Sequence, residues 1–214
     1  MSARLVILGG LLLALALLRP SLACWHGALH GRPVASRSDL ALAVLGEFRT
    51  FLARAMWMRV DLYHHQLERQ GVPWNQERDL IPLYRAVTTI DPRFEDAYDV
   101  GSYELVINFG RAQEGIDYLD EGLRANPRSR LLHFDRAFVM HHLKRWRESV
   151  EDANTALALS VTSDDKRSAL RLMASCGRQL DDRVLQARAL FLWGELFPGD
   201  PVVRQHLDAL ARSR

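Results

Sequence analysis

An internal repeat with a period of about 34 residues constrains the fold of this chain more than any other feature of its 214 residues. The clearest copy runs from Ala97 to Pro127, with a break at Gly110-Arg111 and a stop at Asn126-Pro127. Proline stops a helix because it lacks a backbone N–H and restricts the residue before it. Small or apolar residues recur 34 positions later, pairing Gly115 with Ser149, Leu119 with Ala153 and Gly122 with Ala156. The pattern predicts stacked helix-turn-helix units.

The pattern extends to both sides of this unit. Pro92, in the string TTIDP, lies 35 residues before Pro127. Ser38 and Asp39 are candidate N-caps for a long first helix, and Pro201 is a good first residue for a last one. No strand-like alternation with hairpin turns is present. The predicted helices span about 38–69, 76–90, 95–109, 112–125, 129–143, 146–159, 164–179, 182–197 and 201–212.

With these features the chain resembles the tetratricopeptide repeat (TPR) family. The matching residues are an early aromatic, small residues in both helices and a closing proline, as at Tyr98, Gly115, Gly122 and Pro127. The third unit departs from the pattern, with Val161 where proline would stand, and the fourth is degenerate. The resemblance implies an all-α, right-handed α-solenoid over residues 38–214. Its expected parts are repeats at about 54–92, 95–127, 129–161 and 164–198, followed by a capping helix at 201–212.

The N-terminus has a different composition. Arg4 precedes an apolar run from Leu5 to Leu18, and small residues stand three and one before Cys24. This layout predicts that residues 1–23 are a secretory signal peptide or an uncleaved membrane anchor, with residues 24–37 as an extended tether. The segment before Cys24 also resembles a bacterial lipobox, which makes Cys24 a candidate lipidation site. Residues 45–63 are similar to the opening of bacterial envelope-associated repeat proteins. We therefore expect this protein to be located in the cell envelope, either at the inner membrane or in the periplasm.

The rest of the composition favours a binding protein over an enzyme. The net charge of +2 gives no basic excess for nucleic acid. No G-x-S-x-G, P-loop or H-E-x-x-H motif is present. Cys176 has no C-x-x-C neighbour and is expected to be a small apolar residue of the core. We therefore expect no catalytic residue, no cofactor and no small-molecule substrate.

Two pairs of adjacent histidines, His64-His65 and His141-His142, raise the question of a metal site. Adjacent residues on a helix point about 100° apart, whereas helical metal pairs usually stand three or four residues apart. The two pairs are also separated by a whole repeat, and packed helices lie roughly 10 Å apart. We therefore predict that neither pair binds a metal.

The resemblance implies a different use for some of these residues. In TPR arrays the first helix of each unit lines a concave groove that binds a partner peptide or helix. Carried over by position, the implied partner-binding residues are Met58, Leu62, His65, Tyr103, Val106, Phe134, Phe138 and His141. An alternative is that the long first helix fills the groove, which would make these residues part of the core.

The sequence thus predicts a protein-interaction scaffold or adaptor at the bacterial cell envelope. Its partner would be a protein, and its N-terminal segment would contact the membrane. The alternative is a membrane-anchored assembly or regulatory subunit of a membrane enzyme complex.

Overall fold

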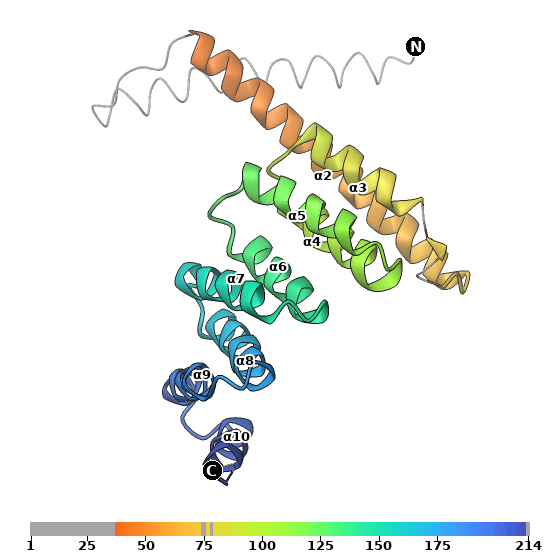
Figure 1. Cartoon of the computed structure of the whole chain (residues 1–214). Coiled ribbons are helices and arrows are strands. Elements are labelled where there is room, and N and C mark those ends of the chain that lie inside the picture. The colour runs from red at the N-terminus through yellow and green to blue at the C-terminus, as the bar shows by residue number, and fades with distance from the viewer. Residues whose placement is uncertain (1–36, 74–75, 78, 213–214) are drawn as a thin grey trace, which may run out of the picture. The chain divides into compact units, whose positions relative to one another are not determined.

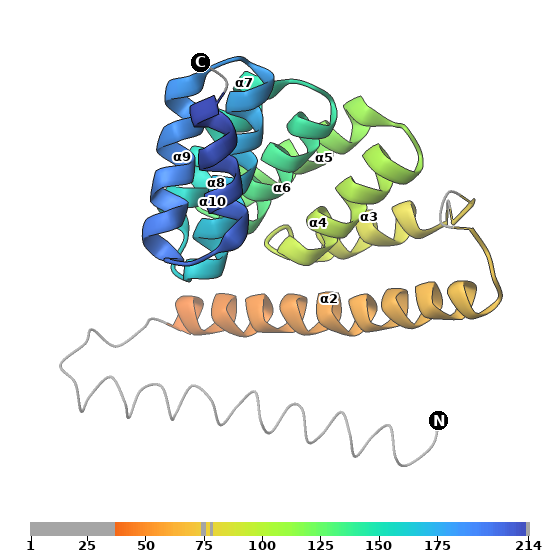
Figure 2. The same ribbon diagram turned by 90° about the horizontal axis from the view of Figure 1, so that it is seen from below.

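The computed structural model describes residues 37–73, 76–77 and 79–212. The chain divides into two compact units, Met1–Leu52 and Ala53–Arg214. In the first unit, the described residues form the N-terminal part of α2. The second unit holds the rest of α2 and all later helices (Figures 1 and 2). The elements are α2 (Arg37–Arg69), α3 (Leu80–Ile90), α4 (Glu95–Tyr103), η2 (Glu104–Asn108), α5 (Ala112–Ala125), α6 (Arg130–His142), α7 (Trp146–Leu159), α8 (Ser163–Gln179), α9 (Arg183–Leu196) and α10 (Pro201–Arg212).

The described residues between 53 and 212 form an all-α solenoid built from helix pairs, as the repeat pattern predicts, and the described part of the chain contains no strand. The pairs are α4–η2 with α5, α6 with α7, and α8 with α9. The first helices of successive pairs also contact each other, α4 with α6 and α6 with α8. Because α10 packs on α9, it covers one side of the last pair.

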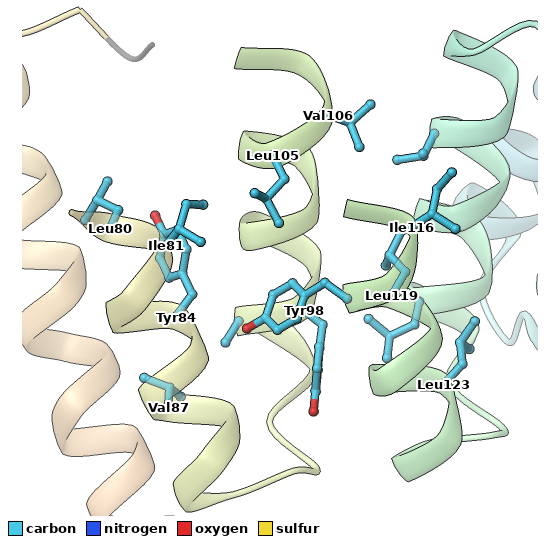
Figure 3. Packing of buried hydrophobic residues seen from close by; sticks show 14 of the residues in the cluster. Leu80, Ile81, Tyr84, Val87, Tyr98, Leu105, Val106, Ile116, Leu119 and Leu123 are labelled. Atoms are coloured by element: carbon cyan, nitrogen blue, oxygen red, sulfur yellow. The ribbon is translucent and has the colours of Figure 1, made fainter. Parts of the chain in front are cut away.

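Small residues allow the helices to approach closely, as predicted from the repeat. A Cβ atom on Gly122 of α5 would lie 2.7 Å from Cγ of Tyr98 on α4. On Gly101 it would lie 2.6 Å from Cε1 of Tyr118. Both distances are shorter than van der Waals contact, so only glycine fits at these crossings. Figure 3 shows buried side chains of α3, α4, η2 and α5, among them Tyr98 and Leu119, which lie between α4 and α5.

The turn inside each helix pair has a left-handed residue at the same place. Gly110, Lys144 and Asp181 have φ of 67°, 62° and 55°. A backbone hydrogen bond closes each turn, and in the second and third of these turns it spans five residues, from Arg145 N to Met140 O and from Asp182 N to Gly177 O. This is the usual closure of a helix C-terminus. These three residues therefore provide a structural register for aligning the repeats.

The first pair departs from this pattern by one residue. Its turn is closed by a bond from Arg111 N to Leu105 O at 2.7 Å, which spans six residues. The extra residue lies in η2, a π-helical turn, where Asn108 Nδ2 donates to Oε2 of the buried Glu104 at 2.7 Å. Before η2 the α4 residues match α6 residues 35 positions later, and after η2 the offset is 34. The helix predicted at 95–109 is therefore continuous from Glu95 to Asn108, but it contains a one-residue insertion.

The helix predicted at 76–90 begins later, at Leu80. The residues before it form turns, with bonds from Gln76 N to Pro73 O and from Leu80 N to Glu77 O. Glu77 is buried, and its carboxylate lies 2.7 Å from His64 Nδ1 on α2. Because this contact holds the loop against α2, the loop residues do not form the first turn of α3.

Candidate partner-binding face

The first helices of the pairs carry an exposed aromatic stack. Tyr103 on α4 and Phe138 on α6 lie 35 residues apart, at matching positions before η2. Their ring centroids are 6.3 Å apart with an interplanar angle of 20°. The two residues remain 43% and 39% exposed. We call the surface of α4, α6 and α8 that includes this stack the α4–α6–α8 face.

Two carboxylates lie one turn before the aromatic stack, Asp99 on α4 and Asp135 on α6. Burial, with the nearby Asp99 and Glu95, raises the pKa of Asp135 to about 8, while Arg130 opposes this rise. Oδ2 of Asp135 is buried and has no hydrogen-bond partner in the described residues. Burial, with Asp96, also raises the pKa of Asp99, and Arg130 opposes this. Near neutral pH the Asp135 carboxyl is therefore largely protonated.

His141 lies on the same helix as Phe138, three residues further on. Its Nε2 is 2.9 Å from Ser175 Oγ on α8, and its ring meets Trp146 edge-on with centroids 4.8 Å apart. Burial lowers the pKa of His141, and Arg178 and His142 lower it further. The imidazole is thus neutral at pH 7 and joins α6 to α8.

Two other predicted residues do not contribute an exposed side chain to this face. Val106 is only 3% exposed and packs against Gly115 on α5. Val106 is buried because η2 shifts the register, so that Val106 matches the buried Met140 and Ile107 matches His141. Phe134 is half-buried and packs against the core formed by α6 to α10.

The predicted residues of the first repeat lie on α2. Met58 and Leu62 are one turn apart and are 66% and 62% exposed. His65 is exposed, with Nδ1 3.2 Å from Glu68 Oε2. Trp57 packs instead against Tyr84 and Phe94, at centroid distances of 5.7 and 5.6 Å. The alternative that the long helix fills the groove stays a prediction.

The fourth repeat contributes residues that the sequence pattern did not reveal. Matching Asp181 to Lys144 gives an offset of 37, so Arg171, Ser175 and Arg178 correspond to Phe134, Phe138 and His141. They are missed when the offset of 34 is carried forward, because α8 is one turn longer than α6. The signal that locates them is the turn string Leu180-Asp181-Asp182, which aligns with Leu143-Lys144-Arg145 of the preceding repeat. Counting back from this turn along α8 gives the three residues.

An ion-pair network ties the first helix pair to the second on another side of the repeats. Arg136 donates to both carboxylate oxygens of Asp152, at 2.7 and 2.8 Å, and to Asp120 Oδ1 at 2.6 Å. His133 Nδ1 lies 3.2 Å from the same Asp152. These groups border a polar cavity of about 410 Å³. Since each charge has a partner, the network is a structural link between α5, α6 and α7.

The histidine pair on α2 comes closer to a metal-binding geometry than the angular argument suggests. One ligand atom each from His64, His65 and Glu68 lies within 4.8 Å of the others. Nδ1 of His64 is already bonded to Glu77, and Nδ1 of His65 to Glu68. The ring of His64 therefore fastens α2 to the loop that follows it, whereas the contacts of His65 lie within α2.

Cys176 is a buried free thiol, in agreement with its expected place in the core. Its Sγ is 3.3 Å from Ser149 Oγ, and burial raises the pKa of the thiol above its usual value, with Ser149 opposing. A thiol in this state is a poor nucleophile.

The predictions for residues 1–23, for the tether to residue 36 and for Cys24 lie outside the described residues. None of the helices in the described part of the chain combines the length and apolar character that a membrane span requires.

No protein-family model matches the chain, and no curated protein matches it. Among solved structures, the chain is similar to a thermophilic TPR protein of Thermus thermophilus, with 20% sequence identity and a TM-score of 0.49. The match covers 90% of this chain and 98% of that one.

Proposed function

We propose that this protein is a scaffold that binds a peptide or helix of a partner protein on the α4–α6–α8 face. The observation that carries the proposal is the exposed stack of Tyr103 and Phe138. Aromatic side chains are enriched at the centres of protein interfaces, because each buries a large apolar area at a low cost in conformational entropy.

The surroundings of the stack support a defined binding surface. His141 is fixed by Ser175 and Trp146, and the rings of Tyr103 and Phe138 stack on each other. These side chains come from α4, α6, α7 and α8 and are anchored by contacts within the solenoid, so the surface is organised before a partner arrives. Preorganisation reduces the entropy lost on binding.

Site-specific photo-crosslinking tests this function. A photoreactive phenylalanine analogue at Phe138 should crosslink one defined partner in the native host, whereas the same analogue at the exposed Arg188 of α9 should not. Tyr103→Ala together with Phe138→Ala should weaken capture of that partner by at least tenfold, as expected for two interface hot spots. Equal crosslinking from both positions would contradict a defined interface.

We also propose that the scaffold acts at the bacterial cell envelope. The apolar run from Leu5 to Leu18 and the adjacent Cys24 support this location. Intact-mass measurement of the membrane fraction tests it. A mass lacking residues 1–23 and carrying acyl groups indicates a lipoprotein, and the full-length mass indicates an anchor. Recovery of all protein from the soluble cytoplasm would contradict the location.

A further inference from the structure

A small cavity lies between α8, α9 and α10. It encloses about 180 Å³. From α8 it is lined by Arg171, Ser175 and Arg178, and from α10 by His206. The apolar part of its wall comes from Ala174, Leu190, Trp193 and Val202.

The cavity carries positive charge without a matching carboxylate. No Asp or Glu is among the residues that line it. Within the described part of the chain, neither Arg171 nor Arg178 forms an ion pair, whereas Arg130 and Arg136 do. Asp200, at the turn into α10, has both oxygens engaged, by Trp193 Nε1 at 3.1 Å and by Val202 N at 2.9 Å. Two guanidinium groups therefore remain available for an anion.

The geometry of one of these groups is partly fixed. The guanidinium carbon of Arg171 lies 5.8 Å from the centroid of the Trp193 ring. An arginine that packs on an aromatic ring keeps its N–H donors in a restricted orientation, which favours two-point binding of a carboxylate.

The cavity is continuous with the α4–α6–α8 face. Ser175 lines the cavity and is also the partner of His141 at 2.9 Å. In the register set by the turn residues, Arg171 and Arg178 occupy the positions of Phe134 and His141 in the preceding repeat. A segment that covers Phe138 and His141 therefore leads directly to the cavity.

We propose that this cavity binds a glutamate side chain of the partner segment, an inference that rests on the proposed function. The two arginines bind the carboxylate, and the exposed apolar side chain of Val202 covers the methylene groups of the stem. Glutamate combines both parts. Arg171 and Arg178 lie at the α8 end of the same face, away from Asp99 on α4, so the segment docks with its acidic residue toward α10.

A small probe tests the cavity directly. N-acetyl-glutamate methylamide, which carries a single side-chain carboxylate, is titrated into the ¹⁵N-labelled full-length protein. The measured signals are the Nε–H groups of Arg171 and Arg178 and the indole N–H of Trp193. We expect saturable shifts, and at least tenfold weaker binding of N-acetyl-glutamine methylamide, because the neutral amide loses a charge-assisted hydrogen bond.

Matched variants assign the effect to the cavity. Arg171→Gln with Arg178→Gln should abolish saturable binding, whereas Arg147→Gln with Arg188→Gln removes the same charge at exposed sites elsewhere and should not change it. The single variant Arg178→Gln should also lose at least tenfold in affinity. Equal binding of the glutamine probe, unchanged binding by the double cavity variant, or tighter binding of inorganic phosphate would overturn the proposal.

The two proposals can fail separately. Tyr103→Ala with Phe138→Ala should leave binding of the glutamate probe unchanged while it weakens partner capture. If the probe does not bind but the crosslinked partner is recovered, the cavity assignment alone is wrong. If the probe binds and no partner is recovered, the glutamate comes from another source and the proposed scaffold function fails. Binding of the partner through its C-terminal carboxylate, lost on amidation of its terminus, would overturn the side-chain assignment.

Discussion

Val106 packs onto Gly115 so closely that a Cβ atom on the glycine would overlap with its side chain. The same crossing recurs in the last pair, but there the glycine is on the first helix and the larger residue on the second. Gly177 on α8 faces Gln186 on α9. A Cβ on Gly177 would lie 2.7 Å from the backbone nitrogen of Gln186. Each helix pair thus needs one small residue at its crossing, and either helix can supply it.

This crossing predicts a steric effect on stability. Gly177→Ala should lower the free energy of unfolding by about 2 kcal/mol, since the new methyl group meets a backbone that cannot move aside. Gly46→Ala is the matched control, because its Cβ would have no neighbour within 4 Å. That change should not destabilise, since alanine favours a helix by up to about 1 kcal/mol over glycine. Chemical denaturation followed by circular dichroism measures both, and similar losses would contradict the steric explanation.

The buried carboxyl of Asp135 predicts a pH dependence of folding. Its pKa is raised from 3.8 to about 8, so the folded state holds a proton that the unfolded chain releases at a lower pH. Stability from this group is fully present below pH 4 and is lost as the pH rises toward 8. Asp135→Asn should therefore flatten the fall in unfolding free energy between pH 5 and 8, by about 2 kcal/mol.

The control for this experiment is Asp117→Asn on α5, an exposed carboxylate bonded to Gln113 at 2.8 Å. It should leave the pH profile almost unchanged. A wild-type profile that is flat between pH 5 and 8 would show that Asp135 is ionised in the folded protein.

The network around Arg136 predicts an asymmetric effect of charge removal. Arg136→Met should cost about 3 kcal/mol of stability, because it leaves the buried Asp152 without its main cationic partner. Arg145→Met removes an exposed ion pair with Glu148 and should leave the free energy of unfolding almost unchanged. Thermal unfolding compares the two variants. Restoration of stability by adding Asp152→Asn to Arg136→Met would confirm that the unpaired charge causes the loss.

The exposed aromatic stack predicts a surface role that does not involve the core. Tyr103→Ala with Phe138→Ala should change the unfolding free energy by about 1 kcal/mol or less, since both rings are substantially exposed. Ala137→Leu, at a buried site on α6 next to Phe138, should be far more harmful through overpacking. Collapse of the fold in the aromatic double variant would show that these rings belong to the core, as the filled-groove alternative holds.

The sequence was sufficient to predict most of this architecture, because proline stops, small residues and apolar spacing reflect local physics. The boundaries of α5 and α7 match the predicted helices at both ends. Small residues at the helix crossings, such as Gly122, also lie where the repeat places them.

The candidate face was harder to predict, because it depends on register. One residue inserted in η2 leaves the apolar pattern of α4 almost unchanged, yet it moves Val106 from the face to the core. In the fourth repeat the small residue of the crossing stands on α8 instead of α9, and the closing proline of the third unit is replaced by Val161. Without these markers, the offset of 37 that reveals Arg171 and Arg178 cannot be found from spacing alone.

The inserted residue in η2 also determines how this protein could be extended. In a longer array built by copying the α4–α5 unit, every copy would contain the inserted residue. The residues after η2 would then be rotated around the axis of each first helix, so its two halves would expose different faces. The α6–α7 unit has no such insertion, and α6 keeps a regular α-helical register from its cap at Ser129 to its turn at Lys144. It is therefore the module from which a regular synthetic array should be made. The α4–α5 unit would be used only where a shift of the helix register is wanted.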